Sequence, residues 1–331
     1  MPRRRRSPDA TLRHALILLL LLALGWLLDE CGVFGRQPRG AAASARLLRV
    51  GAWNIEWCGR PAQRSGPGQG VRQTPEDLAD YIAFAQVAVL ALEEILVDLR
   101  DDRSQTLDRV VVALDARTGG QWQYVLHPGR HADDQRTGVL WDRRQVTARA
   151  PGGQDWDPRR DGPWRVPIQD QKSLWARPPH AMCFSAGPER TDFVVVPVHM
   201  KADYLGDFAR QRESEARALV AALPRITRAF TDQDVLVIGD ANLAQPVEPA
   251  VSVFETAGLR WLNPERRATH WPSGALDAAF VPRDQSEFAG DFEVVGERYC
   301  TARGFTAAEF RRRFSDHWLV VTSLRIGPDD D

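Results

Sequence analysis

Lysine is almost absent from this sequence. Lys172 and Lys201 are the only two, so arginine supplies nearly all of the positive charge. Five arginines against one aspartate give residues 1–14 a net charge of +4, which leaves −5 for residues 15–331 out of the total of −1. A mildly acidic protein lacks the broad positive surface that is typical of nucleic-acid-binding proteins, although it can still have a local basic groove. The places of the two lysines are therefore informative.

Cysteine is also scarce. The four cysteines form no CxxC pair and no cluster with histidine of the kind that favours zinc. An exported protein could oxidise two of Cys58, Cys183 and Cys300, but the sequence does not give the connectivity. Cys31 is a poor lipidation site, because two acidic residues precede it where small residues are needed. The sequence thus leaves one disulfide open and gives no sign of structural zinc.

The hydrophobic run near the N-terminus is short for a membrane span. It is ALILLLLLALGWLL at residues 15–28, fourteen residues, whereas a spanning helix needs roughly 17–25. It follows the basic cluster Arg3–Arg6, and this order is typical of a secretion signal. Small residues at 41–45 offer a cleavage site but lie far beyond the run, so an uncleaved signal anchor is an equal alternative. Under the positive-inside rule, either alternative places residues from about 46 onward outside the cytoplasm, in a secreted, periplasmic or membrane-anchored protein.

Strand-like and helix-like segments alternate through the rest of the chain. Capping residues, prolines and acids in the first turn predict helices at 74–85, 104–119, 207–226 and 248–258. Apolar runs bounded by turn residues predict strands at 47–57, 87–95, 121–128, 137–142, 181–187, 192–200, 234–242, 275–282 and 316–326. Residues 150–180 are predicted to be an insertion or a long loop. Adjacent strands often read as hairpins, so the segments together favour mixed sheets flanked by helices.

Polar residues stand at the ends of four predicted strands, in AWNIE, LALEE, PVHMK and VIGDAN. Two further segments, LDAAF and FSDHW, carry an acid at the start or in the middle. Strand ends that meet at one edge of a sheet are where sites are built. Carboxylate oxygens suit Mg²⁺, and nearby histidines can transfer protons or stabilise a developing oxyanion. The pattern predicts a hard-cation site with acid/base chemistry.

In this order, the six segments resemble the motifs of the endonuclease/exonuclease/phosphatase family, which has the DNase I-like fold. WNIE resembles the family's opening Asn motif, LALEEI its Leu-Gln-Glu motif, PVHMKAD its His-Leu-Lys motif and IGDAN its Gly-Asp-x-Asn motif. LDAAFVP resembles the late Asp strand, and SDHWLVV the terminal Ser-Asp-His. The resemblance covers residues 48–326. It implies an α/β fold, a four-layer αββα sandwich of two mixed sheets flanked by helices, in a domain at 46–331 that follows a signal or anchor segment and linker at 1–45.

The resemblance also implies which residues bind the cation and the substrate. Asn54, Glu94 and Asp316 would hold Mg²⁺, with Mn²⁺ as the alternative, and Glu94 would be the principal carboxylate ligand. Lys201 follows the His motif, where a cation that faces the phosphate is expected. Arg177 precedes that strand in a segment that resembles the family and would also bind phosphate.

Five further residues would carry the reaction if the resemblance holds. His199 would contact the phosphate and protonate the leaving oxygen. Asp240 would orient or deprotonate the attacking water, and Asn242 would hold the phosphate. Asp277 would pair with His317, fix its tautomer and favour its charged form.

The sequence departs from the family pattern at several positions. Glu93 stands where glutamine is usual and adds a negative charge beside Glu94. Ala241 replaces an aromatic residue, and Ala278 stands where His or Tyr is frequent. None of these changes removes a core ligand, but the loss of bulk near the site leaves the substrate class open.

The function that the resemblance implies is a divalent-metal-dependent phosphoesterase, exported or membrane-anchored. A nuclease-like phosphodiesterase that hydrolyses P–O bonds by in-line attack of water is favoured, with nucleic acid as the preferred substrate. A phosphatase or phosphodiesterase for lipid headgroups or small phosphate esters is one alternative, and an inactive surface binding module is another. We expect a monomer that contacts the membrane through its N-terminal segment if that segment is uncleaved.

Other polar residues receive no functional role from the sequence. The charged residues of the predicted helix at 207–226 are expected to form its solvated face: Arg210, Arg212, Glu213, Glu215 and Arg217. Four histidines lie outside the motifs and are given no role: His127, His131, His180 and His270.

Overall fold

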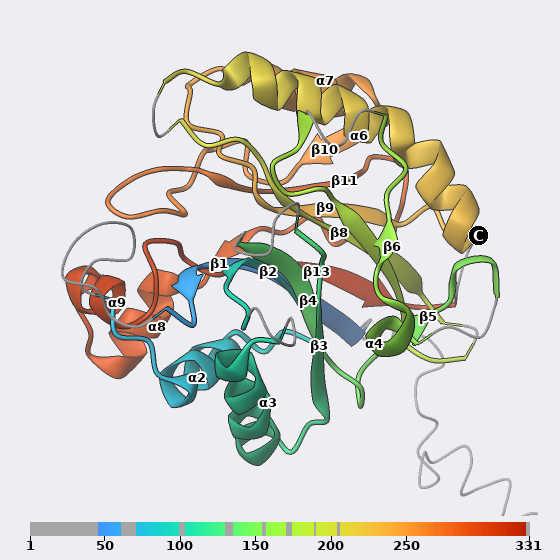
Figure 1. Ribbon diagram of the computed structural model, residues 1–331. Coiled ribbons are helices and arrows are strands. Elements are labelled where there is room, and N and C mark those ends of the chain that lie inside the picture. The colour runs from blue at the N-terminus through green and yellow to red at the C-terminus, as the bar shows by residue number, and fades with distance from the viewer. Residues whose placement is uncertain are drawn as a thin grey trace, which may run out of the picture. The chain divides into compact units, whose positions relative to one another are not determined.

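Two mixed sheets with helices outside them make up the described part of the chain in the computed structural model (Figure 1). The structure describes residues 46–60, 71–98, 103–129, 135–153, 157–169, 174–188, 190–203 and 206–328. The signal or anchor segment predicted at 1–45 lies outside the described residues, and so does Lys172. Among the described residues, none of the helices combines the length and the apolar character that crossing a membrane requires.

The first sheet has six strands in the order β12-β13-β1-β2-β4-β3. β1 and β2 run parallel, and every other neighbouring pair is antiparallel, including the predicted hairpin of β3 and β4. The bounds are β1 Arg46–Cys58, β2 Val89–Ile95, β3 Trp122–Leu126, β4 Arg136–Asp142, β12 Glu293–Val294 and β13 Val320–Ile326.

The second sheet has seven strands, six of them in the order β10-β11-β9-β8-β7-β5, with β6 paired to β7. β8 and β9 run parallel, and the other pairs are antiparallel, including the predicted hairpin of β7 and β8. The bounds are β5 Thr147–Arg149, β6 Trp164–Arg165, β7 His180–Ser185, β8 Asp192–His199, β9 Val235–Asp240, β10 Leu259–Trp261 and β11 Asp277–Pro282.

Side chains of both sheets fill the space between them. Trp141 and Val89 of the first sheet belong to the same buried cluster as Phe184, Phe193 and Ile238 of the second. The ring centroids of Trp141 and Phe184 are 5.5 Å apart in an edge-to-face contact. Burial of apolar surface stabilises such a core by about 25 cal/mol per Å². This packing fixes the two sheets against each other, so strand ends from both can meet at one edge.

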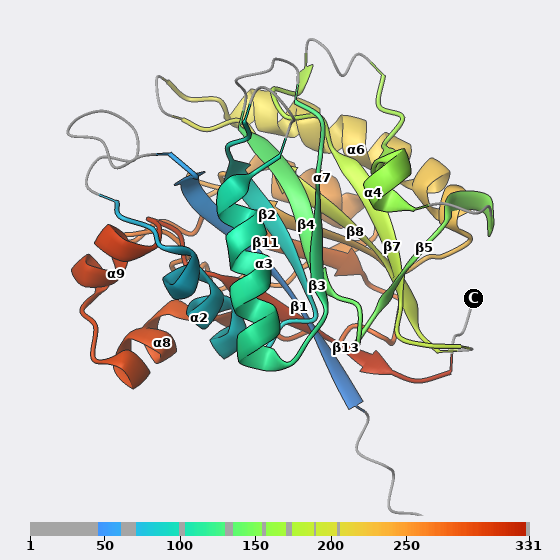
Figure 2. The same ribbon diagram turned by 60° about the horizontal axis from the view of Figure 1, so that its bottom comes forward.

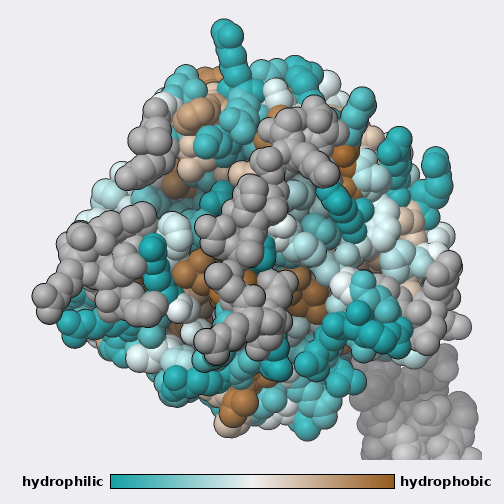
Figure 3. Space-filling model, in the orientation of Figure 1, coloured by the Kyte–Doolittle hydropathy of each residue, from teal (hydrophilic) through white to brown (hydrophobic). Residues whose placement is uncertain are grey.

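Helices cover the two outer faces, as the views in Figures 1 and 2 show. Apolar side chains of α2, α3, α8 and α9 pack on the first sheet, and those of α6 and α7 pack on the second. The bounds are α2 Pro75–Ala85, α3 Gln105–Thr118, α4 Pro158–Asp161, α6 Ala209–Phe230, α7 Pro249–Thr256, α8 Gly296–Arg303 and α9 Ala307–Arg313. The four layers confirm the predicted sandwich. On the face drawn in Figure 3, the visible described side chains are mostly hydrophilic, with small separate apolar areas, as is normal for a surface in water.

The local signals in the sequence explain where the first two helices begin. Thr74 accepts a hydrogen bond of 3.2 Å from the backbone N–H of Asp77, and Pro75 occupies the first helical position of α2. Ser104 caps α3 in the same way, and Gly119 ends it in the left-handed conformation. These predicted boundaries are confirmed to within a residue.

Several elements were not predicted from the sequence. Helices α8 and α9 occupy residues 296–313, where no helix was expected, although Thr306 and Glu309 form a capping box at the start of α9. The last strand begins at Val320 rather than at residue 316. Residues 150–180 are largely irregular, as expected, but they include the short elements α4 and β6.

The prediction that Arg212 and Glu215 lie on a solvated face is wrong, because both are buried. Arg212 donates hydrogen bonds of 2.8 Å to Oε1 of Glu248 and 2.7 Å to Oδ1 of Asp203. Glu215 accepts one of 3.0 Å from the backbone N–H of Lys201. Charged groups can be buried when they have such partners. The partners lie outside the helix, so the helix pattern alone did not reveal them.

The three described cysteines are buried and unpaired. Cys58 and Cys300 lie in the core between the first sheet and its helices, and Cys183 lies in the core on the other side of the sandwich. The disulfide that the sequence left open is therefore not formed among Cys58, Cys183 and Cys300.

Candidate active site

Strand register brings the predicted acidic and histidine side chains of the second sheet to one edge. His199, at the end of β8, pairs with Asp240, at the end of β9, and Asp240 pairs in turn with Asp277, at the start of β11. In the first sheet, Asn54 of β1 pairs with Glu93 of β2, which places Glu94 one residue further along. Residues that are remote in the sequence thus become neighbours through the pairing of strands.

Asn54 links the two sheets at this edge. Its Nδ2 donates hydrogen bonds of 3.2 Å to Oε1 of Glu94 and 3.0 Å to Oδ2 of Asp240. Its Oδ1 accepts one of 3.0 Å from the backbone N–H of Glu56, and its carbonyl accepts one of 2.6 Å from the hydroxyl of Ser315. With all these contacts, the buried amide holds two carboxylates of different sheets in fixed positions.

Asp277 and His317 form the predicted pair. Nδ1 of His317 lies 2.9 Å from Oδ2 of Asp277, and both side chains are buried. Nε2 of His317 lies 3.7 Å from Oδ2 of Asp240. Burial alone would lower the pKa of His317, but the charges of Asp277 and Asp240 raise it well above its usual value. The two carboxylates therefore favour the charged form of the imidazole, which is the form that the resemblance implied.

His199 has the opposite electrostatic character. Burial, followed by the positive charges of Arg177 and His317, lowers the pKa of His199 well below its usual value, so the ring is neutral. Its Nε2 lies 3.5 Å from Oδ2 of Asp240 and 3.9 Å from Oε1 of Glu94. Its Nδ1 has no hydrogen-bond partner among the described residues. Two histidines in different protonation states therefore face one carboxylate.

The backbone at Glu94 is unusual, with a φ of 60°. Oε2 of Glu94 accepts hydrogen bonds of 3.1 Å from the backbone N–H of Trp57 and 2.6 Å from Nε2 of Gln135. Burial raises the pKa of Glu94, and the charge of Asp316 adds to that effect. Carboxylates kept close together in a partly dry site cost free energy, which a bound cation would offset.

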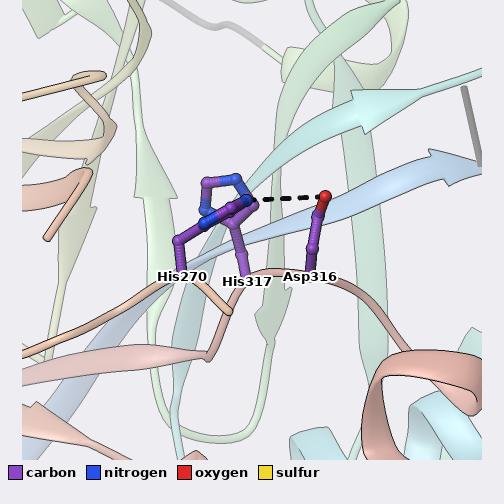
Figure 4. Close-up of side chains that lie close together, drawn as sticks. All are labelled: His270, Asp316 and His317. Carbon is purple, nitrogen blue, oxygen red and sulfur yellow. Dashed lines mark ion pairs between the residues drawn. The ribbon is translucent and has the colours of Figure 1, made fainter. Parts of the chain in front are cut away.

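Asp316 lies at the solvent-accessible side of the site. Burial alone would raise its pKa, but His270, His317 and Arg311 lower it to about 2, so it is ionised at neutral pH. Its Oδ2 lies 3.6 Å from Nε2 of His270 and 3.9 Å from a guanidinium nitrogen of Arg311. Figure 4 shows His270 and Asp316 facing each other beside His317. His270, to which the sequence assigned no role, is thus part of the site.

Of the two predicted phosphate-binding cations, Arg177 acts on the site. Its guanidinium donates a hydrogen bond to Oε1 of Gln135, whose amide in turn contacts Glu94. Its charge lowers the pKa values of both Glu94 and His199. The ammonium group of Lys201 lies over the ring of Phe208, 4.6 Å from its centroid, so its predicted contact with phosphate stays a prediction.

Asn242 lies two positions after Asp240, the last residue of β9. The backbone N–H of Asn242 donates a hydrogen bond of 3.1 Å to Oδ1 of Asp240, and its Nδ2 donates one of 3.1 Å to the carbonyl of Met200. The residue itself has a positive φ of 51°. In this conformation Asn242 ties β8 to β9, and its predicted contact with phosphate is not tested.

Glu93 lies beneath the site, fully buried between the two sheets. Burial, followed by the charges of Asp277 and Asp240, raises its pKa well above its usual value. Neither carboxyl oxygen has a hydrogen-bond partner among the described residues. Burial therefore favours the protonated, neutral form of Glu93, which is similar in shape to the glutamine usual in the family.

Gly239 permits this close approach of the sheets. A Cβ atom at residue 239 would lie 2.6 Å from Oε1 of Glu93 and would also overlap the backbone of Val198. Its φ of 141° also disfavours other residues. Steric contacts therefore require a glycine at this position of the IGDAN motif.

Three residues that contribute to the site were missed by the sequence analysis, namely Gln135, His270 and Arg311. Gln135 precedes β4 and bridges Arg177 to Glu94. Arg311 comes from the unpredicted helix α9 and forms an ion pair of 2.5 Å with Glu56. None of them ends an apolar run, so the strand-end signal did not point to them.

The donors near Glu94 suit a hard divalent cation. Glu94 and Asp316 offer carboxylate oxygens, which Mg²⁺ and Mn²⁺ prefer. Oδ1 of Asn54 accepts the backbone N–H of Glu56 and its Nδ2 faces Glu94, so ligation by Asn54 stays a prediction. Asp316 is ionised at neutral pH, and burial makes the charged form of Glu94 costly. Both effects favour a positive charge there. These residues fit the predicted cation.

Comparison with known proteins places the fold. No protein-family model matches the sequence, and no curated protein matches it. Solved structures do match. The human Nocturnin catalytic domain with bound sulfate is 18% identical, covers 85% of this chain and 95% of its own, and gives a TM-score of 0.53.

Two further structures are similar to the same extent. An endonuclease/exonuclease/phosphatase family protein from Bacteroides thetaiotaomicron is 13% identical over 85% of this chain and 98% of that chain, with a TM-score of 0.53. The D. rerio TDP2 complex with a single-strand DNA product is 14% identical over 84% of this chain and 99% of that chain, with a TM-score of 0.51. At such identities the similarity concerns the fold, and it confirms the predicted DNase I-like architecture.

Proposed function

We propose that this chain, which has the DNase I-like fold, belongs to the endonuclease/exonuclease/phosphatase family and is a divalent-metal-dependent phosphoesterase. One observation carries the proposal. Polar residues of the six predicted segments meet at one edge, where the charged His317, paired with Asp277 at 2.9 Å, faces Asp240, and Asn54 joins Asp240 to Glu94. A cation held by Asn54, Glu94 and Asp316 would neutralise charge on a phosphoryl oxygen.

The protein's own residues account for the remaining steps. Asp240 orients a water molecule and takes its proton, since burial raises the pKa of Asp240 toward that of a useful base. The new bond forms between the water oxygen and phosphorus, and the bond to the leaving oxygen breaks in line with it. That oxygen takes a proton from solvent water, and Asp240 releases to solvent the proton that it took, so the products are an alcohol and a phosphate monoester.

The two histidines have different parts in this scheme. The charged His317, fixed by Asp277, binds and neutralises a phosphoryl oxygen. His199 is neutral, and a neutral imidazole fits a hydrogen-bond donor to the phosphate better than the general acid that the sequence suggested. Arg177, which reaches Glu94 through Gln135, adds positive charge on the same side.

A nuclease-like phosphodiesterase is the more specific function that we propose. Trp271, whose backbone N–H donates a hydrogen bond of 2.7 Å to the carbonyl of Asp316, is 41% exposed, and Trp57 next to Glu94 carries Arg60 over its ring. Exposed aromatic rings and arginines beside a phosphate site suit single-stranded nucleic acid. The neighbouring TDP2 structure holds a single-strand DNA product, which supports the same class.

A lipid headgroup or a small phosphate ester is the second candidate substrate. The acidic net charge of residues 15–331 disfavours a broad nucleic-acid surface, and the predicted N-terminal anchor would place the site near a membrane. Export or anchoring through residues 15–28 belongs to the proposal in both cases.

The test is hydrolysis by the purified full-length chain, with Mg²⁺ or Mn²⁺ and with a chelator. We expect it to nick supercoiled DNA, with rates reduced at least about 100-fold in His199→Ala and Asp240→Ala. Activity on phospholipid micelles but not on DNA would favour the second candidate. An absence of hydrolysis on every phosphodiester tried would leave an inactive surface binding module.

A further inference from the structure

His270 lies beside Asp316, one of the proposed ligands of the cation. Its Nε2 lies 3.6 Å from Oδ2 of Asp316, and the ligand atoms of His270, Asp316 and His317 all lie within 4.8 Å of one another (Figure 4). A distance of 3.6 Å is too long for a direct hydrogen bond. It is close to the separation of roughly 3.0–3.4 Å between two atoms that bind one cation at about 2.1 Å each. The pair is therefore spaced for a shared ion.

The backbone holds His270 in this place. The N–H of Trp271 donates to the carbonyl of Asp316 at 2.7 Å, and the N–H of Trp318 donates to the carbonyl of Thr269 at 2.7 Å. These bonds flank a short antiparallel bridge between His270 and His317. The hydroxyl of Thr269 also accepts the backbone N–H of Asp277 at 2.9 Å. The segment that carries His270 is thus fixed to the residues on both sides of the site.

Solvent access and charge favour a cation beside Asp316 and His270 rather than beside His317. The side chains of His270 and Asp316 are 27% and 25% exposed, so a hydrated ion can reach them, whereas His317 is 6% exposed. His317 faces a carboxylate with each ring nitrogen, Asp277 with Nδ1 at 2.9 Å and Asp240 with Nε2 at 3.7 Å, so neither nitrogen is left for an ion on Asp316. Arg311 faces Asp316 at 3.9 Å, but its closer ion pair, at 2.5 Å, is with Glu56. His270 is consequently the nitrogen donor available to an ion on Asp316.

We propose that His270 joins Asp316 as a ligand of the divalent cation, and that its nitrogen makes the site prefer Mn²⁺ to Mg²⁺. Imidazole nitrogen binds first-row transition metals more strongly than Mg²⁺, which favours oxygen ligands and retained water. The inference rests on the proposed function, because the metal centre at Glu94 and Asp316 belongs to that proposal.

The test measures metal binding rather than activity. Isothermal titration calorimetry on the metal-free full-length chain gives the affinities for Mn²⁺ and Mg²⁺ in wild type, His270→Ala and His270→Asn. We expect wild type to bind Mn²⁺ at least about tenfold more tightly than Mg²⁺, and both variants to lose at least about tenfold in Mn²⁺ affinity with little change for Mg²⁺. Equal losses for the two metals, or no loss, would overturn the inference. Ser273→Ala, an exposed side chain in the same segment, is the matched control and should change neither affinity.

Pulsed electron paramagnetic resonance of the Mn²⁺ complex gives a direct signature. We expect coupling of the bound Mn²⁺ to a ¹⁴N nucleus in wild type and its loss in His270→Asn. Coupling that persists in the variant, or that is absent in wild type, contradicts ligation by His270.

A further variant separates this inference from the proposed function. Glu94→Gln should abolish high-affinity binding of both metals. If it does and the His270 variants behave as wild type, only the role of His270 is wrong. If Glu94→Gln binds Mn²⁺ as tightly as wild type, the metal centre itself is elsewhere, and both proposals are wrong.

Discussion

Nδ2 of Asn54 in the first sheet lies 3.0 Å from Oδ2 of Asp240 in the second, and the same amide contacts Glu94 at 3.2 Å. A single buried side chain therefore sets the position of a proposed metal ligand against that of the proposed base. The relationship depends on the packing between the sheets, since each residue belongs to a different hydrogen-bonded ladder.

Replacing Asn54 should affect rate and stability together. Asn54→Ala leaves the half-buried carboxylate of Glu94 and the buried carboxylate of Asp240 without their shared donor, which should cost about 1–3 kcal/mol in the free energy of unfolding. Displacement of Asp240 should also reduce kcat by at least about 100-fold. Urea denaturation and initial-rate measurements check the two effects. Unchanged values of both would show that the amide does not hold the site.

The charge on His317 should depend on Asp277. In Asp277→Asn the nearest negative charge is removed, so the pKa of His317 should fall, because burial then dominates. Nuclear magnetic resonance titration of the histidine rings in the metal-free chain measures the shift. Asp80→Asn, which removes a carboxylate that contacts Tyr299 and Arg303 instead, is the control and should leave His317 unchanged.

The same pair has a consequence for stability. The folded-state pKa of His317 is raised above its unfolded value, so its proton contributes stability that is fully present below about pH 6.5 and is lost as pH rises through the folded-state pKa. Asp277→Asn should remove this contribution. If the stability difference between wild type and the variant did not shrink as pH rises through that range, the assignment of charge to His317 would be wrong.

Glu93 should be replaceable by its neutral analogue. The folded-state pKa of Glu93 is raised, so the native state keeps a proton that the unfolded state loses above its ordinary pKa, and stability falls as pH rises from about 4.5 through the folded-state pKa. Glu93→Gln removes this cost. We expect the variant to be more stable than wild type at pH 7, by an amount that grows with pH, while hydrolysis persists. Thermal denaturation between pH 5 and pH 8 measures it, and a variant less stable than wild type at pH 7 would contradict a neutral Glu93.

Arg212 should be among the most sensitive positions outside the site. Arg212→Ala leaves Glu248 and Asp203 without their buried partner, which should cost roughly 3–5 kcal/mol. Arg210→Ala, on the exposed side of the same helix, should change the free energy of unfolding by less than about 0.5 kcal/mol. Chemical denaturation compares them, and similar effects of the two substitutions would mean that the buried pair adds little.

The sequence was sufficient for the fold and for the main polar strand ends. Apolar runs that end in polar residues located β1, β2, β8 and β9, and the order of the motifs located Asp277 and His317, which the structure brings to 2.9 Å. This worked because the strands themselves are signalled locally, by alternating or continuous apolar residues bounded by turns.

Residues that reach the site from elsewhere were not predictable in this way. His270 is held by a short bridge to His317, Gln135 precedes a strand, and Arg311 lies on the unpredicted helix α9. Their roles arise from tertiary contacts across more than 40 positions of the chain. The burial of Arg212 is similar, because its partners Glu248 and Asp203 become neighbours only after the loops have folded.

The most direct test of the account is the initial rate of phosphodiester hydrolysis by the full-length chain before chelation, after chelation and after Mn²⁺ is restored, in wild type and in Asp240→Asn. We predict that chelation abolishes the wild-type rate, that Mn²⁺ restores it, and that Asp240→Asn is slower by at least about 100-fold at every Mn²⁺ concentration. Hydrolysis that survives both chelation and the loss of the Asp240 carboxylate would contradict a metal-dependent reaction at this edge of the two sheets.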